Sequence, residues 1–287
     1  MKQINLKEWT RIGAGGNGKT YKSEDESDVL LKVNNGEGAE YERVKREYDL
    51  SCAVRGMGIR TPETFEIVQV GKGYGTLFER IRGKKSLCRI CADNPSRIAE
   101  MAALMSRRGR ELHAVECTDA LIRPAKEYAL KGLEHFREDL TPEELKAVEG
   151  WIDALKDVKT CLHGDFNPGN LIVSGEGDWW IDLGRFSYGD PLLDVAHLYM
   201  FCNEGRDSWI VRKVIEHISH MKFSQLQLFW NAFLDAEGIE DKAGFEKVIL
   251  PYLAMDKLVR HGFQHSDRFK GNVLRSIRKA MPVGYFY

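Results

Sequence analysis

The chain has 287 residues, 43% of them hydrophobic and 30% charged, and its formal net charge is −1. A charge this close to zero argues against partners held by bulk electrostatic attraction, such as nucleic acid or an anionic membrane surface. The opening stretch MKQINLKEWT lacks the apolar region of a secretory signal, and no apolar run approaches the roughly 20 residues that span a bilayer. We therefore expect a cytoplasmic protein with no nucleic-acid partner and no membrane partner.

The first motif is the glycine-rich stretch GAGGNGKT at residues 13–20. It matches the P-loop, the dinucleotide fingerprint and the glycine-rich loop of protein kinases, all of which bind phosphate. The first two patterns require a helix directly after the loop. Here residues 20–33 read instead as a short strand, a polar turn and an apolar strand. The sequence thus predicts a β-hairpin whose Gly13, Gly15 and Gly18 let backbone N–H groups point at a phosphate.

A lysine and a helix follow the glycine hairpin. Lys32 closes the apolar strand VLLK, so we expect it to contact the same phosphate rather than serve only as a solvated edge residue. Residues 37–58 have the pattern of a helix that ends at a pair of glycines. Glu40 and Glu47 are seven residues apart and share one face of that helix, so either could orient Lys32. We favour Glu47, which lies deeper in the helix, over a purely solvated acidic face.

Two further strands, at residues 64–71 and 74–83, are expected to complete a small sheet. Beyond Gly83 the sequence becomes mostly helical. The composition therefore predicts two domains, residues 1–82 and residues 83–287. Within the second, Cys88 and Cys91 form a lone C-x-x-C pair, which without a second ligand pair predicts reduced structural thiols rather than a zinc site.

The next helices carry start signals. Thr141 with Glu144, and Ser224 with Gln227, each have the spacing of a capping box. The sequence thus predicts helix starts at both places.

The most informative stretch is CLHGDFNPGNLIVSGEGDWWIDLGRFSYGDPLLDVAHL, residues 161–198. Residues 171–173 and 179–181 read as strands joined by a turn-rich link, residues 174–178. Folded as a symmetric hairpin, the segment places Asn170 opposite Asp182, with Cβ atoms about 5 Å apart. Asp165 lies just upstream in an irregular loop.

Carboxylate and amide oxygens gathered in this way suit Mg²⁺, which prefers one or two carboxylates, substrate phosphates and water. Phosphoryl transfer requires charge neutralisation, alignment and a group that accepts the proton of the nucleophile. We therefore expect Asn170 and Asp182 to hold the metal and Asp165 to accept the proton or to orient the hydroxyl. Each residue alone is ordinary in a turn, but the joint pattern after a glycine loop and a strand lysine favours a function.

The motifs HGDFNPGN and IDLGRFSYGDPLLDVA resemble those of the aminoglycoside phosphotransferase family, from the glycine loop to about residue 200. The resemblance implies an α+β fold with two protein-kinase-like lobes, a small antiparallel-sheet N-lobe with one long helix and a larger, mostly helical C-lobe. It also implies an ATP- or GTP-dependent kinase of small-molecule hydroxyls, with residues 1–82 binding nucleotide and residues 83–287 binding the acceptor.

The resemblance also assigns roles to individual residues. It implies that Asp165 is the catalytic base, that Asn170 and Asp182 bind Mg²⁺, and that Lys32 contacts the phosphates with Glu47 as its partner. The backbone around Glu79 and Ile81 would hydrogen-bond the nucleobase.

One departure from protein kinases bears on the acceptor. Only seven residues separate Asp182 from Asp190, and no A-P-E motif follows, so we infer a small acceptor rather than a peptide. We interpret Asp190, Asp194 and His163 as supports of the catalytic loop. Arg185 could meet phosphate, substrate or an acid, and the sequence does not decide among them.

The nature of the acceptor remains open at this stage. A polycationic aminoglycoside needs clustered carboxylates, and the candidate acids are interspersed with cations: Glu204, Asp207, Asp235 and Asp256 stand among Arg206, Arg212, Lys257 and Arg260. A general hydroxyl kinase therefore ranks above an aminoglycoside O-phosphotransferase. A nucleotide-binding pseudokinase module is the alternative of another class, and the oligomeric state is not predicted.

Overall fold

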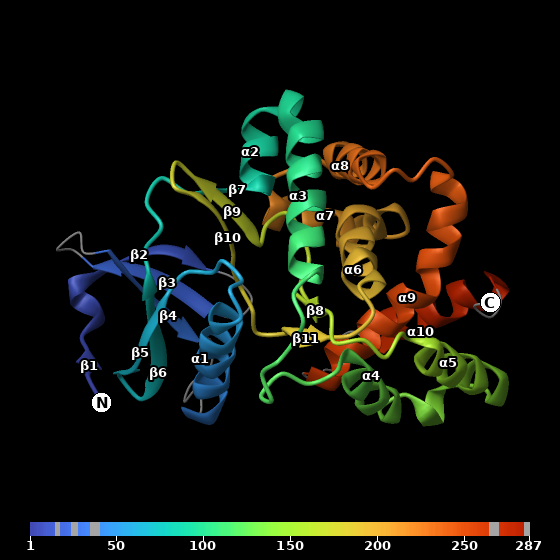
Figure 1. Ribbon diagram of the computed structural model, residues 1–287, viewed down its shortest axis with the longest axis horizontal. Helices are drawn as coiled ribbons and strands as arrows, with labels where there is room; N and C mark the ends of the chain where they lie inside the picture. The colour runs from blue at the N-terminus through green and yellow to red at the C-terminus, as the bar shows by residue number, and fades with distance from the viewer. Residues whose placement is uncertain (15–17, 24–27, 35–40, 264–269, 284–287) are drawn as a thin grey trace. The chain divides into compact units, whose positions relative to one another are not determined.

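The computed structural model describes residues 1–14, 18–23, 28–34, 41–263 and 270–283 (Figure 1). The chain folds into two compact units. The first comprises Met1–Lys85 with Ile172–Gly184, and the second comprises Ser86–Leu171 with Arg185–Tyr287. Gly15 and Glu40, which the sequence analysis singled out, lie outside the described residues.

The first unit is built on a six-stranded sheet with the order β1-β5-β6-β4-β3-β2. Its pairs are antiparallel except for β1 with β5, which run parallel. Alternate strand residues face a core of Leu31, Val68, Val70 and Leu77. The strands are β1 (Gln3–Ile4), β2 (Trp9–Ala14), β3 (Gly18–Ser23), β4 (Val29–Asn34), β5 (Thr64–Val70) and β6 (Gly73–Glu79), with a 3₁₀ turn at Leu6–Glu8.

One helix, α1 (Tyr41–Gly56), packs against β5 and β6 of this sheet (Figure 1). Its buried face includes Val44, Leu50 and Val54. The chain leaves the helix through Gly58, whose φ of 84° is a left-handed conformation that favours glycine. The packed face of α1 fixes which of its side chains turn toward the sheet.

A hairpin from the middle of the chain completes the first unit. Its strands, β9 (Leu171–Ser174) and β10 (Gly177–Trp180), belong to a small sheet with the order β10-β9-β7, in which β7 is Lys85–Ser86. Ile172 and Trp179 pack on Ile81. The link between the strands is two residues, 175–176, so the expected five-residue link was wrong. Gly177 and Asp178, which read as turn residues in the sequence, begin the second strand.

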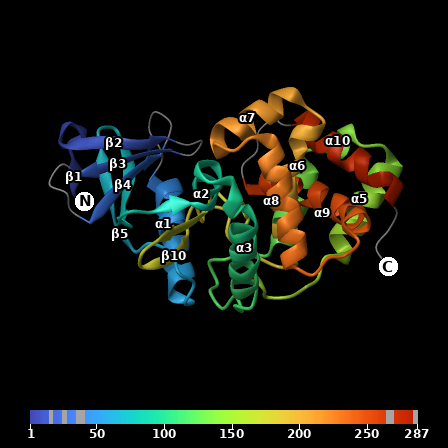
Figure 2. The same cartoon turned by 90° about the horizontal axis from the view of Figure 1, so that it is seen from above.

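The second unit is mostly helical. Helices α3 and α8 pack side by side, and α9 packs against α4, α6 and α10 (Figures 1 and 2). Large aromatic side chains, among them Trp151, Trp230, Phe136 and Phe166, are fully buried there. The helices are α2 (Leu87–Asp93), α3 (Ile98–His113), α4 (Ala125–Glu134), α5 (Pro142–Ala154), α6 (Leu192–Asn203), α7 (Trp209–Ser219), α8 (Phe223–Ala236), α9 (Lys242–Phe263) and α10 (Lys270–Ala280), and the short strands are β8 (Cys161–Leu162) and β11 (Ser187–Tyr188).

The two predicted capping boxes had different outcomes. Thr141 and Glu144 form theirs at the start of α5, with hydrogen bonds of 3.0 and 3.2 Å. The box predicted at Ser224 was wrong by two residues, because α8 begins at Phe223 and Gln225 accepts the backbone N–H of Lys222.

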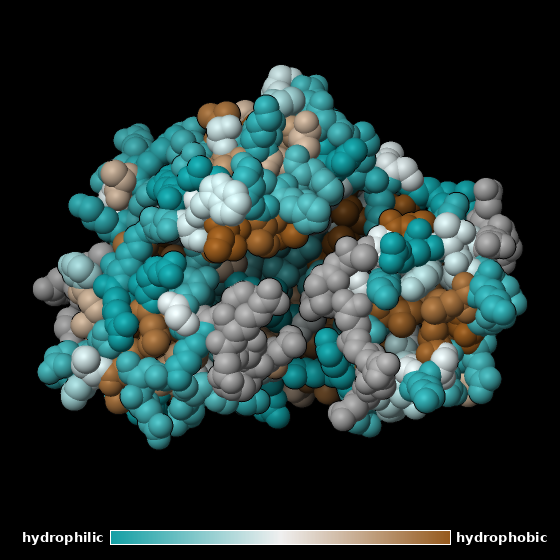
Figure 3. All heavy atoms as spheres, turned by 180° about the vertical axis from the view of Figure 1, so that it is seen from behind, coloured by the Kyte–Doolittle hydropathy of each residue, from teal (hydrophilic) through white to brown (hydrophobic). Residues whose placement is uncertain are grey.

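Two further observations concern the cysteines and the surface. Cys88 and Cys91 are free and buried, and burial raises the pKa of Cys91 to about 12. Among the helices of the described residues, none combines the length and the apolar character needed to cross a membrane. The face drawn in Figure 3 is largely hydrophilic, with its hydrophobic residues in separate patches.

Candidate active site

The described ends of the glycine-rich stretch, residues 13–14 on β2 and residues 18–20 on β3, lie on two paired antiparallel strands. Gly18 is the first residue of β3, and a Cβ at this position would lie 2.6 Å from the carbonyl oxygen of Val33 on β4. Only glycine allows β3 and β4 to approach in this way. Residues 18–23 are a strand, so no helix follows the glycines and the P-loop and dinucleotide readings do not apply. Gly13 pairs with Thr20 across these two strands.

The structure brings Lys32, Glu47 and Asp182 together within the first unit. Lys32 Nζ, on β4, donates a hydrogen bond to Glu47 Oε1 on α1, and lies 3.4 Å from Asp182 Oδ1 after β10. Burial by itself lowers the pKa of Lys32, but the two carboxylates outweigh it and raise this pKa above its ordinary value. The ammonium is therefore a fixed positive charge at neutral pH.

Asp182 has an unusual backbone. Its φ is 61°, and His220 is the only other non-glycine residue with a positive φ in the described ranges. A left-handed conformation costs about 1–2 kcal/mol for such a residue, and strain of this kind concentrates at functional sites. The strained turn directs the Asp182 carboxylate toward Lys32.

The predicted nucleobase segment follows β6. The side chain of Glu79 accepts the backbone N–H of Glu63 at 3.0 Å, and the backbone N–H of Glu79 donates to the carbonyl of Glu63 at 2.8 Å. Ile81 is buried on Ile172 and Trp179. Among the described residues, no backbone acceptor is found for the N–H of Ile81.

In the second unit, the loop that carries Asp165 lies between β8 and Asn170. Strand β8 pairs with β11, so that the loop after β8 lies beside Arg185, which precedes β11. Gly164 has a φ of 73°, and a Cβ there would lie 2.1 Å from the carbonyl oxygen of Arg185. The glycine of the HGD motif is therefore required both by its own conformation and by the close approach of the neighbouring backbone.

Asp194, in the first turn of α6, holds the backbone of this loop. Its carboxylate accepts the N–H groups of His163 at 2.8 Å and Gly164 at 2.9 Å, and His113 Nε2 lies 2.9 Å away. His163 Nδ1 in turn accepts the N–H of Asp165 at 3.2 Å. Burial alone would raise the pKa of Asp194, but the hydrogen bond and charge of His113 and the loop amides lower it.

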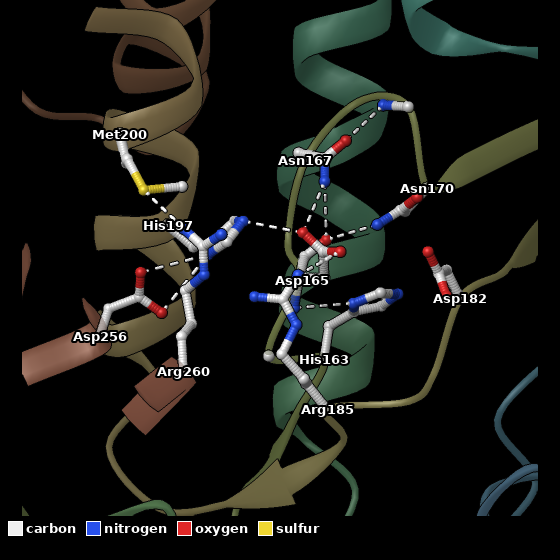
Figure 4. A network of polar contacts seen from close by, with 12 residues as sticks. His163, Asp165, Asn167, Asn170, Asp182, Arg185, His197, Met200, Asp256 and Arg260 are labelled. Carbon is white, nitrogen blue, oxygen red and sulfur yellow. Dashed lines mark hydrogen bonds and ion pairs between the residues drawn. The ribbon is translucent and has the colours of Figure 1, made fainter. Parts of the chain in front are cut away.

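The Asp165 carboxylate is held by two side chains from different segments (Figure 4). Arg185 donates to Oδ2 at 2.6 Å, and His197 Nε2, on α6, lies 2.8 Å from Oδ1. Burial by itself would raise the pKa of Asp165, but the charge of Arg185 and the hydrogen bond from His197 hold it well below its usual range. Asp165 is thus ionised at neutral pH.

Two asparagines complete the loop. Asn167 donates to both the carbonyl and Oδ1 of Asp165 at 3.0 Å. Asn170 Nδ2 donates to the carbonyl of Asp165 at 2.8 Å. Because the amide nitrogen of Asn170 is used in this way, its Oδ1 atom is the side-chain atom left to accept a ligand.

His197 is a site residue that the sequence analysis missed. Its Nδ1 lies 3.2 and 3.3 Å from the two carboxylate oxygens of Asp256 on α9, while Nε2 faces Asp165. Burial lowers the pKa of His197, but the charge of Asp256 and the hydrogen bonds to both carboxylates raise it overall. No local signal identified this histidine, because it lies in an apolar helix far along the chain from Asp256.

The residues predicted to hold Mg²⁺ fit that ion by their chemistry. Asn170 offers an amide oxygen whose direction is set by its bond to Asp165, and Asp182 offers a carboxylate. Both are hard oxygen donors. In the residues that the structure describes, no group of three or more His, Cys, Asp or Glu side chains forms a self-sufficient metal site.

The fold is shared with solved kinases. A thermostable mutant of aminoglycoside phosphotransferase APH(4)-Ia, in ternary complex with ADP and hygromycin B, is 11% identical, with a TM-score of 0.61 over 97% of this chain and 95% of that chain. Amicoumacin kinase hAmiN, in complex with AMP-PNP, Ca²⁺ and Ami, is 13% identical, with a TM-score of 0.53 over 99% and 91%. A choline/ethanolamine kinase family protein from Mesorhizobium loti is 15% identical, with a TM-score of 0.56 over 96% and 87%. At such identities the likeness concerns the fold alone, and it confirms the predicted α+β, kinase-like architecture.

The fold is that of the kinase-like neighbours, and the family match gives the class of protein. Residues 8–223 match the model of the APH phosphotransferase enzyme family, and the chain belongs to that family. The predicted resemblance and the predicted enzyme class are thus confirmed. A search of curated protein sequences found no significant match.

Proposed function

We propose that this protein is a Mg²⁺-dependent kinase that transfers the γ-phosphoryl group of ATP or GTP to a hydroxyl of a small molecule. The observation that carries the proposal is the Asp165 carboxylate, fixed by Arg185 and His197 in a loop whose backbone is held by Asp194. A carboxylate positioned so firmly suits a reaction in which alignment supplies most of the catalysis.

In this proposal residues 1–82 bind the nucleotide. Lys32, oriented by Glu47, contacts the phosphates, and the glycine hairpin with Gly13, Gly15 and Gly18 covers them. The backbone N–H of Ile81, which makes no backbone hydrogen bond to any residue that the structure describes, follows Glu79 at the end of β6 and supports hydrogen bonding to a nucleobase there. Residues 83–287 bind the acceptor.

Asn170 and Asp182 would hold Mg²⁺ in the working enzyme. When bound, the ion neutralises phosphate charge and aligns the phosphoryl group for transfer. The support lies in the donor atoms themselves, the amide oxygen of Asn170 and the carboxylate of Asp182, which lies 3.4 Å from the ammonium of Lys32.

Asp165 serves to orient the acceptor hydroxyl and to receive its proton. Its depressed pKa makes the carboxylate a weak base that stays ionised at neutral pH. In a loose phosphoryl-transfer transition state the nucleophile needs little deprotonation before attack, so a weak but well-placed base suffices. Asp165 Oδ2, which accepts one hydrogen bond from Arg185, retains capacity for a second donor.

A coupled assay of phosphoryl transfer tests the proposal. Purified protein is incubated with ATP or GTP, with and without Mg²⁺, against a panel of sugars, amino alcohols, hydroxy acids, nucleosides and aminoglycosides. We expect transfer to at least one small hydroxyl compound, dependent on Mg²⁺ and abolished in Asp165→Asn. Nucleotide binding that does not respond to metal, with no turnover on any acceptor, would instead identify a pseudokinase.

A further inference from the structure

We propose that the acceptor carries a negatively charged group, a carboxylate or a phosphate, and that Arg260 together with Arg185 binds this group while the acceptor hydroxyl lies against Asp165. The inference rests on the proposed kinase function and specifies its substrate class. It concerns residues of the second unit only.

The first observation is an arginine with unused hydrogen-bond donors. Arg260, near the end of α9, is partly buried, and its only hydrogen bond within the described ranges goes to Met200 Sδ at 3.0 Å (Figure 4). A guanidinium carries five N–H donors, and a thioether sulfur is a weak acceptor. Burial lowers the pKa of Arg260, as does the charge of Arg185, yet arginine stays protonated in proteins. The site therefore holds a charge that lacks a strong acceptor.

The second observation is that the nearby acids are already paired. Glu204 is bonded to Lys257, which also donates to Asn272 at 2.8 Å and Ser276 at 2.7 Å. Both oxygens of Asp256 face His197. Four acids were candidates for binding a polycationic acceptor. Of these four, Glu204 and Asp256 are the two whose charges act on Arg260.

The other two acids are exposed and also paired. Asp207 lies 2.7 Å from Lys279, and Asp235 lies 2.5 Å from Lys242. Exposed pairs of this kind are weak and exchange readily, so they do not form a preorganised site for an amine.

Charge then discriminates between acceptors. An ammonium group placed next to Asp165 would meet the guanidinium groups of Arg185 and Arg260, and like charges in a partly buried site repel strongly. An anion in the same place would instead satisfy the donors of Arg260 with charge-assisted, two-pronged hydrogen bonds. The arrangement thus favours an anionic hydroxyl compound over an aminoglycoside.

A purely structural role for Arg260 is the competing explanation. In that case Arg260 would serve to neutralise Asp165 and Asp256. Within the described part of the chain it donates a hydrogen bond to neither carboxylate, although its charge acts on both. A structural arginine and a ligand-binding arginine differ in what their removal does to the stability of the protein without ligand.

The experiment compares acceptors in pairs that differ by one anionic group. D-glycerate is measured against glycerol, gluconate against glucose, and glucose 6-phosphate against glucose, with hygromycin B as the polycation. Each is assayed with the wild type, Arg260→Gln, Arg260→Lys and the control Arg107→Gln, whose side chain is exposed on α3. We expect kcat/KM to favour an anionic member over its neutral partner by more than tenfold, and the preferred pair identifies the charge as carboxylate or phosphate.

The Arg260 variants then test the assignment itself. We expect Arg260→Gln to raise KM for the anionic acceptor by roughly ten- to a hundred-fold with little change in kcat. Arg260→Lys should recover part of the loss, and Arg107→Gln should behave as the wild type. Arg260→Gln should also retain its melting temperature without ligand. A fall in that temperature together with equal losses on anionic and neutral acceptors would overturn the assignment.

Thermal-shift binding of the same probes separates this inference from the proposed kinase function. If anionic probes bind through Arg260 but no acceptor is phosphorylated, the binding site stands and the kinase proposal fails. If phosphoryl transfer occurs and hygromycin B or a neutral alcohol is the best acceptor, the kinase proposal stands and the anionic site fails. If no anionic probe binds at millimolar concentration, the anionic site also fails.

Discussion

The carboxylate of Asp194 accepts the backbone N–H of His163 at 2.8 Å across 31 residues of chain, and the adjacent N–H of Gly164 at 2.9 Å. The charge of one buried aspartate thus holds the backbone that leads into Asp165. A helix N-terminus is a favourable place for such a carboxylate, because the helix dipole stabilises negative charge there. The position of the loop that carries Asp165 therefore depends on Asp194 being ionised.

Replacing Asp194 by asparagine should weaken the fold and the activity together. The amide can accept only one of the two loop N–H groups well, and the other would face an NH₂ group. We expect a loss of about 3 kcal/mol in the free energy of unfolding, measured by urea denaturation at pH 7. Asp157→Asn, at an exposed position, is the control and should change this free energy by less than about 0.5 kcal/mol.

Alanine substitutions at two glycines can separate backbone strain from close packing. Gly164 and Gly83 have similar positive φ values, 73° and 65°, but a Cβ would lie 2.1 Å from Arg185 O at the first and has no heavy atom within 4 Å at the second. Gly83→Ala should cost about 1 kcal/mol of stability from conformation alone. Gly164→Ala should cost clearly more and lower turnover, because the Arg185 backbone must move. Equal losses in urea denaturation would contradict the packing argument.

Asp165→Asn should abolish most of the catalysis and leave nucleotide binding nearly intact. The neutral amide cannot receive the proton of the hydroxyl, and loss of a general base typically lowers the rate by about 10²- to 10⁴-fold. Steady-state kinetics measures the rate, and thermal shift with ATP and Mg²⁺ measures nucleotide binding. If Asp165→Asn kept most of its turnover, Asp165 would not be the catalytic base.

The two lysines near the glycine hairpin distinguish the proposed site from a P-loop. Lys32 is paired with Glu47 and Asp182, whereas Lys19 is exposed on β3. Lys32→Ala should weaken ATP binding by tenfold or more, since a charge-assisted contact to phosphate is worth about 1.5–3 kcal/mol. Lys19→Ala should change it little. The test measures the equilibrium affinity of both variants for ATP with Mg²⁺. A larger loss of affinity in Lys19→Ala than in Lys32→Ala would favour the P-loop.

His197 should make the stability of the protein fall as the pH rises above neutrality. It faces Asp165, Asp256 and the nearby Arg260, and its folded pKa is raised above the unfolded value of about 6.5. Its contribution is therefore complete below about pH 6.5 and is lost as the pH rises through the folded pKa. The difference in unfolding free energy between wild type and His197→Gln should decrease from pH 6.5 upward. A flat difference from pH 6 to 9 would refute a charged His197.

Local signals in the sequence predicted most of the fold. The strand pattern after the glycines, the helix of Glu47 and the box at Thr141 all depend on neighbours within a few residues, and the structure has each of them. The predicted length of the hairpin link was wrong because Gly177 and Asp178 are residue types common in turns, whereas here they begin strand β10. Local composition does not reveal where hydrogen bonding resumes.

Contacts between distant segments could not be predicted in the same way. His197 shows this best, since its two carboxylate partners come from the loop before β9 and from α9. The pairing of Glu204 with Lys257, 53 residues apart, likewise removes an acid that the sequence left available. Such pairings depend on how helices pack, which a periodic pattern does not specify.

The first compact unit is made from two separate pieces of chain, because residues 172–184 join it from the middle of the sequence. A fragment ending at Lys85 would lack Ile172 and Trp179, and would leave the apolar side chain of Ile81 facing water. Neither unit can therefore be expressed as one uninterrupted segment without losing part of itself. Gene fusions, split reporters and domain exchanges in this protein must keep residues 172–184 together with residues 1–85, although the two segments are far apart in the sequence.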